Sequence, residues 1–295
     1  MKRAVLATLL TGVLVMSTSA QQPSFKSSVN VVRIDVLVTD GGKPLPNLTA
    51  DDFEVRDNGT LQHVESVIGV FEPIDVLFAF DRSASTRGET LTRLRESAGA
   101  VLDALQPADR AGLLTFNHTV QLAVPVGTAA AVRDALDTIE PDGSTAILDA
   151  VATAVSLAAT SDRRTLVLLF TDGVDAISWL PERTVLDAAR GSDAVIYAVT
   201  LPERGRSAPP NAADDRQLQR LAEAAGGRLL RADRPAELRD RFIDVLREMR
   251  ARYVLTYTPT APDVAGWHAL SIRLKNKKGR VGSRAGYVVP APATR

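Results

Sequence analysis

Three short polar segments carry the side chains of this sequence that could bind a metal ion. They are Asp81-Arg82-Ser83-Ala84-Ser85, Asp142-Gly143-Ser144-Thr145, and the segment that begins with Asp172. Their ligating groups are carboxylate and hydroxyl oxygens, which Mg²⁺ and Mn²⁺ prefer. In the first segment the loop can turn Asp81, Ser83 and Ser85 to one side. Because hydroxyls are neutral, the ion keeps much of its charge, and an Asp or Glu of a partner protein can complete its shell.

The composition leaves little room for other chemistry. The chain has 295 residues, no cysteine and three histidines. Disulfides, thiolate zinc sites, iron–sulfur clusters and cysteine nucleophiles are therefore excluded, and histidine-based catalysis has few candidates. Lys+Arg and Asp+Glu are both 35, so the net charge of zero gives no indication of nucleic-acid binding. The apolar fraction of 45% is typical of a globular protein.

Motifs of common enzyme classes are absent from the sequence. There is no Walker A segment, no G-x-G-x-x-G after a strand and no G-x-S-x-G. A haloacid-dehalogenase-like phosphatase needs a second Asp two residues after Asp81, where Ser83 stands. We therefore predict a non-enzymatic binding module. The alternatives are a metal-assisted hydrolase, for which no base is evident, and a scaffold whose ion is purely structural.

Buried strands alternating with helices must position the polar segments. Residues 74–80, 166–170 and 194–201 are apolar runs, and residues 91–105 show helical periodicity. This alternation predicts a doubly wound, Rossmann-like, mostly parallel sheet with helices on both faces. Ligands bind such sheets at the carboxyl ends of strands, where Asp81 and Asp172 stand.

The flanks of this α/β region alternate with a period of two instead. Residues 28–72 and 251–290 read as strands, with turns at Asn58-Gly59 and at 276–279 and a final strand at 281–289. Each segment is too small for a core of its own. We therefore predict one small β-sandwich made by residues 24–72 and 251–290, into which an α/β domain of residues 73–250 is inserted.

The first twenty residues are typical of a signal peptide. Lys2 and Arg3 precede an apolar stretch from Ala4 to Met16, and Thr18 and Ala20 are small residues that fit a signal-peptidase site. The stretch is too short for a comfortable membrane span. We expect cleavage after residue 20 and a secreted or periplasmic protein. The alternative is an uncleaved anchor, and only then would the protein contact a membrane.

The order Asp81-x-Ser83-x-Ser85, Thr145, Asp172 resembles the metal-ion-dependent adhesion site of von Willebrand factor type A (VWA) domains. The resemblance covers about residues 74–249 and extends into the flanks through motifs of a bacterial VWA-related family. These motifs are Leu48-Thr49-x-x-Asp52-Phe53-x-Val55, Tyr253-x-Leu255-x-Tyr257 and Gly286-Tyr287. The resemblance implies that Ser83 and Ser85 bind the ion directly, that Thr145 joins when a partner is bound, and that Asp81 and Asp172 act directly or through water. We call these five residues the candidate metal ligands.

Simpler explanations exist for several of these residues. Ser83 and Ser85 could cap the next helix, and Asp172-Gly173 could be an ordinary turn. Arg82 stands where the family more often has an uncharged residue, and we take it and Trp179 as candidates for contact with a partner. Trp179 and Leu180 are either an exposed contact or a hydrophobic staple beside a helix that begins at Pro181.

Overall fold

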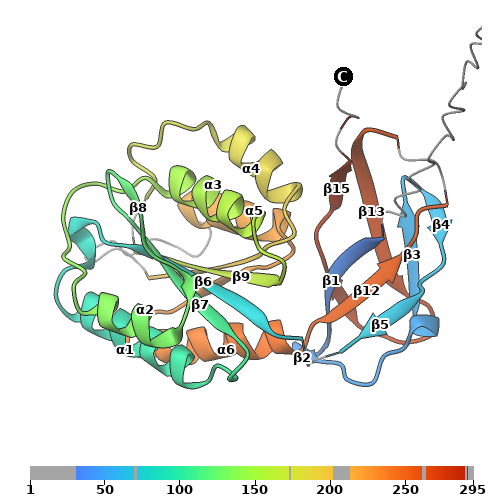
Figure 1. Ribbon diagram of the computed structural model, residues 1–295, viewed down its shortest axis with the longest axis horizontal. Helices are drawn as coiled ribbons and strands as arrows, with labels where there is room; N and C mark the ends of the chain where they lie inside the picture. The colour runs from blue at the N-terminus through green and yellow to red at the C-terminus, as the bar shows by residue number, and fades with distance from the viewer. Residues whose placement is uncertain are drawn as a thin grey trace, which may run out of the picture.

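The structure is a computed structural model that describes residues 31–69, 72–172, 174–201, 213–260, 264–289 and 291. The chain forms an α/β unit and a β-sandwich that lie side by side (Figure 1). The predicted signal peptide, residues 1–20, lies outside the described residues. Among the helices of the described part, none has the length and apolar character needed to cross a membrane.

A mixed sheet forms the centre of the α/β unit, with the strand order β11-β10-β9-β6-β7-β8. All neighbours are parallel except β7 and β8, which are antiparallel. Every residue of β6, β9 and β10 is buried, as expected for strands covered on both faces. The bounds are β6 Ile74–Asp81, β7 Arg110–Phe116, β8 Val120–Gly127, β9 Arg164–Thr171, β10 Val195–Thr200 and β11 Leu229–Arg231.

Helices cover both faces of this sheet (Figure 1). On one face lie α1 (Glu89–Asp103), α2 (Ala129–Leu136) and α6 (Leu238–Arg250) with the short 3₁₀ turn η3 (Pro235–Glu237). On the other lie α3 (Ile147–Ala158), α4 (Glu182–Arg190) and α5 (Ala213–Ala224). Successive residues of a strand face opposite cores, so that Phe78 packs with the first set of helices and Leu77 with the second.

Both ends of the described chain build the sandwich. One sheet has the order β14-β1-β12-β5 with β2 on β1, and the other has the order β15-β13-β3-β4. Strand β1 pairs with β12 from Val32↔Tyr257 to Val36↔Tyr253, which joins residues more than two hundred positions apart. The predicted fold class, an α/β domain inserted in a sandwich made by both termini, is confirmed. The bounds are β1 Val32–Asp40, β2 Lys43–Pro44, η1 Ala50–Asp52, β3 Phe53–Asp57, β4 Thr60–Gln62, β5 Ser66–Ile68, β12 Tyr253–Tyr257, β13 Gly266–Leu274, β14 Arg280–Gly282 and β15 Gly286–Val289.

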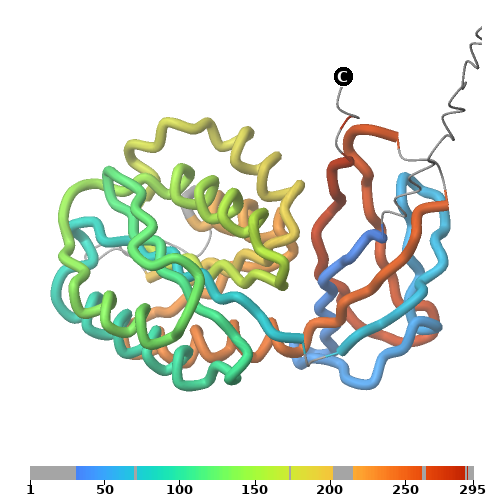
Figure 2. The backbone as a smooth tube through the Cα atoms, in the orientation of Figure 1, coloured from blue at the N-terminus to red at the C-terminus, as the bar shows by residue number. Residues whose placement is uncertain are grey.

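Two turns of the sandwich test the prediction in detail. The hairpin at Asn58-Gly59 is confirmed, since both residues have positive φ angles of 47° and 81° between β3 and β4. The prediction of a single final strand over 281–289 is wrong. It is two strands in different sheets, because β14 pairs with β1 and β15 pairs with β13, so the turn at 276–279 connects the sheets instead of closing a hairpin (Figure 2). The break falls at Arg284, whose buried side chain donates both to Arg33 O (2.7 Å) in the sandwich and to Ser192 O (3.3 Å) in the α/β unit.

A buried arginine joins the two units. Arg252 lies between α6 and β12 and donates to Tyr197 Oη (3.2 Å) and Gly226 O (2.7 Å) in the α/β unit. In the sandwich it donates to the carbonyl oxygens of Asp35 (3.3 Å) and Gly282 (3.4 Å). One cation therefore holds both units at the point where the chain passes between them.

Candidate metal centre

The three polar segments meet at one edge of the α/β sheet. Strands β6 and β9 are parallel neighbours, so their carboxyl ends place Asp81 and Asp172 together. The backbone links the first two segments, since Asp142 N donates to Arg82 O (2.8 Å) and Ala84 N donates to Gly143 O (3.0 Å). The amino ends of the same strands face the sandwich, so this edge lies on the far side of the α/β unit (Figure 1).

Four of the five candidate metal ligands belong to one hydrogen-bonded cluster. Asp81 Oδ1 accepts from Ser83 N (2.7 Å), and Asp81 Oδ2 accepts from Thr171 Oγ1 (2.6 Å). The hydroxyls of Ser83 and Ser85 lie 3.0 Å apart, and Ser85 Oγ donates to Asp172 Oδ1 (2.7 Å). Asp81, Ser83 and Asp172 are buried and Ser85 is exposed, so the cluster reaches solvent at Ser85.

The local backbone explains why both serines are available to this cluster. A 3₁₀ turn, η2 (Ala84–Thr86), follows Ser83, whose carbonyl oxygen accepts from Thr86 N (3.1 Å) and Thr86 Oγ1 (2.9 Å). Ser83 makes no side-chain cap bond to this turn. Helix α1 begins later, with Gly88 as its N-cap at a φ of 86°. The alternative in which these serines cap the next helix is therefore wrong.

Thr145, the fifth candidate metal ligand, lies in the loop that precedes α3. Its side chain is buried, and its carbonyl oxygen accepts from Ala176 N (2.9 Å) and Ile177 N (3.3 Å). Asn117 holds this loop, since its Nδ2 donates to Asp142 O (2.8 Å) and its carbonyl accepts from Ala146 N (2.9 Å). Asn117 belongs to none of the three polar segments. Its place directly after the apolar strand β7 is the signal that could have found it.

The electrostatics of the cluster favour a bound cation. Burial raises the pKa of Asp81 from 3.8 to about 6, and the nearby charge of Asp172 acts in the same direction, against the hydrogen bonds from Thr171 and Ser83. A divalent ion would offset the cost of two carboxylates in this place. The donor set, two carboxylates with hydroxyls, fits Mg²⁺ or Mn²⁺. Within the described residues, no three His, Cys, Asp or Glu side chains come together in a group that could hold a metal ion.

The loop after β9 carries an exposed tryptophan on a fixed backbone. The carboxylate of Asp149 accepts from Trp179 N and Leu180 N, both at 3.0 Å. Asp175 Oδ1 accepts from Ile147 N (2.7 Å), and Ser178 Oγ accepts from Leu148 N (3.0 Å), so the loop caps the first turn of α3. The Trp179 side chain is 92% exposed, so it is not a staple against α4. The sequence did not reveal this anchoring, because an acidic residue looks the same whether it faces water or a distant backbone.

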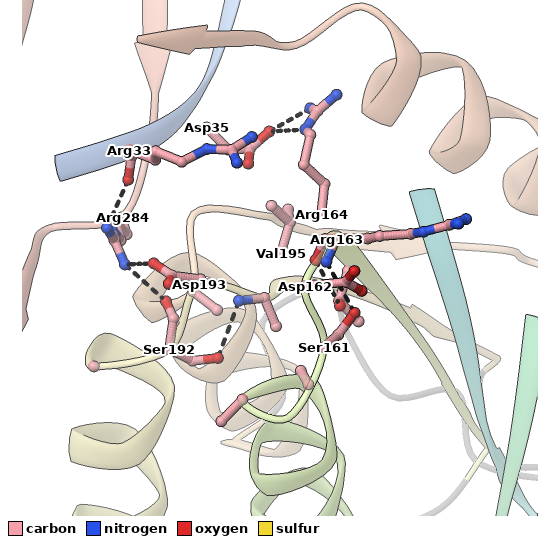
Figure 3. A pocket seen from close by; sticks show the side chains of 16 residues that line it. Arg33, Asp35, Ser161, Asp162, Arg163, Arg164, Ser192, Asp193, Val195 and Arg284 are labelled. Atoms are coloured by element: carbon pink, nitrogen blue, oxygen red, sulfur yellow. Dashed lines mark hydrogen bonds and ion pairs between the residues drawn. The ribbon is translucent and has the colours of Figure 1, made fainter. Parts of the chain in front are cut away.

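A cavity of about 230 Å³ lies at the opposite end of the α/β unit, between it and the sandwich (Figure 3). Two of the arginines that line it, Arg164 and Arg284, have acidic partners across the joint. Arg164 Nε donates to Asp35 Oδ1 (2.9 Å), while Arg284 pairs with Asp193 and donates to Arg33 O (2.7 Å). Because these charges are compensated, we assign this cavity to the joint between the units and not to a ligand.

The family model of the von Willebrand factor type A domain matches residues 75–242, which is more than half of the chain. This chain belongs to the VWA domain family. The VWA match contains all five candidate metal ligands and stops before β12, so the sandwich lies outside it.

Solved structures with little sequence identity share the fold. A von Willebrand factor type A protein from Catenulispora acidiphila is 14% identical, with a TM-score of 0.53 over 85% of this chain and 76% of that chain. The PilB minor pilin of Streptococcus sanguinis is 11% identical, with a TM-score of 0.50 over 62% and 63%. Proximal thread matrix protein 1 of the mussel byssus, solved with zinc in its metal-ion-dependent adhesion site, is 17% identical, with a TM-score of 0.52 over 64% and 48%.

One curated relative is the uncharacterized protein sll0103 of Synechocystis sp., which is 27% identical over 106 residues. The matched part is 34% of this chain and 25% of that protein, so this VWA chain corresponds to about a quarter of the relative's length.

Proposed function

We propose that this VWA protein is an exported, non-enzymatic module that binds a partner protein through a divalent metal ion, Mg²⁺ or Mn²⁺. The observation that carries the proposal is the cluster in which Ser85 connects Ser83 with Asp172, next to the buried Asp81. Membership of a family of protein-interaction domains supports it. The signal-like segment at residues 1–20 supports export to the cell envelope or beyond.

The residues of the cluster have separate roles in this proposal. Asp81 and Asp172 supply negative charge, and the hydroxyls of Ser83, Ser85 and Thr145 supply neutral oxygens. Thr171 and the backbone of Ser83 hold the Asp81 carboxylate in place at 2.6 and 2.7 Å. An ion bound there would supply the positive charge that attracts a carboxylate. Because Ser85 is exposed, an Asp or Glu of a partner can reach the cluster from solvent.

Capture experiments with matched baits test this function. The three baits are the wild-type chain with Mg²⁺, the wild-type chain with EDTA, and Asp81→Asn with Mg²⁺, each mixed with an envelope extract of the source organism. We expect to capture proteins that bind only the first bait, and we expect that binding to be lost when the extract has first been treated with a carboxylate-blocking reagent. Equal capture by all three baits would contradict the proposal.

A further inference from the structure

The exposed apolar side chains of the β9–α4 loop lie beside the candidate metal ligands. Val174, Ile177, Trp179 and Leu180 are 36%, 41%, 92% and 38% exposed. We call these four side chains the apolar rim. The rim begins two residues after Asp172, and the amide of Ile177 donates to the carbonyl of Thr145 (3.3 Å). A molecule that reaches the metal centre therefore meets this rim.

The backbone under the apolar rim is fixed before any partner arrives. The carboxylate of Asp149 accepts from the amides of Trp179 and Leu180 at 3.0 Å. Ser178 Oγ donates to Asp175 Oδ1 (2.5 Å), and the side chains of Ser178 and Asp175 each accept from a backbone amide in the first turn of α3. A tryptophan on a backbone that is already ordered loses less conformational entropy when it is covered than one on an unanchored loop. Tryptophan is among the residues that carry most of the binding energy in protein interfaces once they are buried.

Positive charge flanks the cluster on the segment that follows β6. Arg82 Nη1 donates to Glu140 O (3.5 Å), and Arg87 Nη2 donates to Pro141 O (3.0 Å). These acceptors are neutral carbonyls, and within the described part of the chain neither guanidinium forms an ion pair. The edge of the sheet thus offers an apolar rim on the β9 side and uncompensated cations on the β6 side, which complements an acidic partner.

We propose that the partner is a protein segment that places an Asp or Glu beside a large aliphatic or aromatic residue, so that the carboxylate reaches the metal centre and the apolar side chain covers Trp179. This inference rests on the proposed function, and it adds a requirement for an apolar neighbour. Arg82 and Arg87 favour further acidic residues in the same segment.

An array of immobilised octapeptides with a central Asp tests the inference. The residues on either side of the Asp are varied between Leu, Phe, Ser and Lys, and a second set has Asn at the centre. In Mg²⁺ we expect the wild-type chain to bind Leu- and Phe-flanked Asp peptides about tenfold more strongly than Ser-flanked ones, and Trp179→Ser to lose that preference. Trp267→Ser is the matched control, because Trp267 is the other tryptophan and lies on β13 of the sandwich.

Fluorescence gives a second readout on the same peptides. With Trp267→Phe, Trp179 is the single tryptophan of the chain, and its emission should shift to shorter wavelength when the best Leu- or Phe-flanked peptide binds. No shift in spite of Mg²⁺-dependent binding would overturn the inference, because the peptide would then leave Trp179 in water.

The outcomes separate the two proposals. Asp-dependent, Mg²⁺-dependent binding with the same preference in Trp179→Ser as in the wild type overturns the apolar requirement and leaves the proposed function standing. Binding that ignores EDTA and accepts Asn peptides overturns both, and so does an array that the wild-type chain does not bind. Sedimentation that shows a dimer of the wild-type chain and a monomer of Trp179→Ser would identify a second copy as the occupant and overturn the inference.

Discussion

Asp81→Asn should make the metal-free protein more stable, although it replaces one of two carboxylate oxygens that accept hydrogen bonds by an amide NH2 that cannot. Burial raises the pKa of Asp81 from 3.8 to about 6, with a further contribution from Asp172. The folded state therefore holds the proton more tightly than the unfolded state, so stability falls as pH rises from about 4 to above 6. A pKa difference of about 2 units corresponds to a loss of about 3 kcal/mol in the free energy of unfolding, and the wild type carries this loss in full at pH 8. Asn is neutral at every pH and avoids this cost.

Denaturant unfolding in EDTA at pH 4, 6 and 8 measures the effect. We expect the variant to be more stable than the wild type at pH 8 by up to about 3 kcal/mol, and the difference to vanish near pH 4. In saturating Mg²⁺ the order should reverse, since only the wild type gains binding free energy. Asp103→Asn is the control, because Asp103 is an exposed carboxylate paired with Arg133 at 2.6 Å. A variant less stable than the wild type in EDTA at pH 8 would refute the reasoning.

Three further predictions concern the sandwich and its joint. Truncation after Arg250 removes β12 and leaves β1 without its partner from Val32 to Val36, so limited proteolysis should cleave within residues 31–69. A protease-resistant monomer would argue against a sandwich core shared by the two flanking segments. Arg252→Met leaves four acceptors without their cation and should lower the free energy of unfolding by about 3 kcal/mol or more in denaturant unfolding; unchanged stability would contradict the role of Arg252 at the joint. The buried Asp57 carboxylate accepts from Tyr257, Tyr287 and His268 at 2.8, 2.7 and 2.9 Å. Asp57→Ala should therefore destabilise the sandwich by several kcal/mol, while the Mg²⁺ affinity measured by calorimetry stays unchanged. Equal stability of the variant and the wild type would show that these three hydrogen bonds are dispensable.

Local patterns in the sequence predicted the α/β unit well because its strands are buried on both faces. Residues 74–80 and 166–170 are nearly continuous apolar runs, and such runs occur where helices cover both sides of a strand. Asp81 and Asp172 follow these runs directly, so their meeting at one edge follows from the parallel pairing of β6 and β9.

The features that the sequence did not reveal depend on contacts between distant segments. The break between β14 and β15 depends on Arg284, which reaches the loop before β10, and nothing near residue 284 in the sequence indicates that contact. Asn117 and Asp149 look like surface turn and helix residues, yet they bind the backbone of loops 25 and 30 positions away. Polar residues that bind distant backbone groups carry no periodic signal.

Calorimetric titration of Mg²⁺ into the metal-free chain tests the central claim most directly. The account predicts one ion bound per chain for the wild type and for the control Asp103→Ala, and no binding heat for Asp81→Ala, whose circular dichroism should be unchanged. Equal Mg²⁺ affinity in Asp81→Ala and the wild type, or a wild-type chain that binds neither Mg²⁺ nor Mn²⁺, would contradict a metal centre at this edge of the sheet.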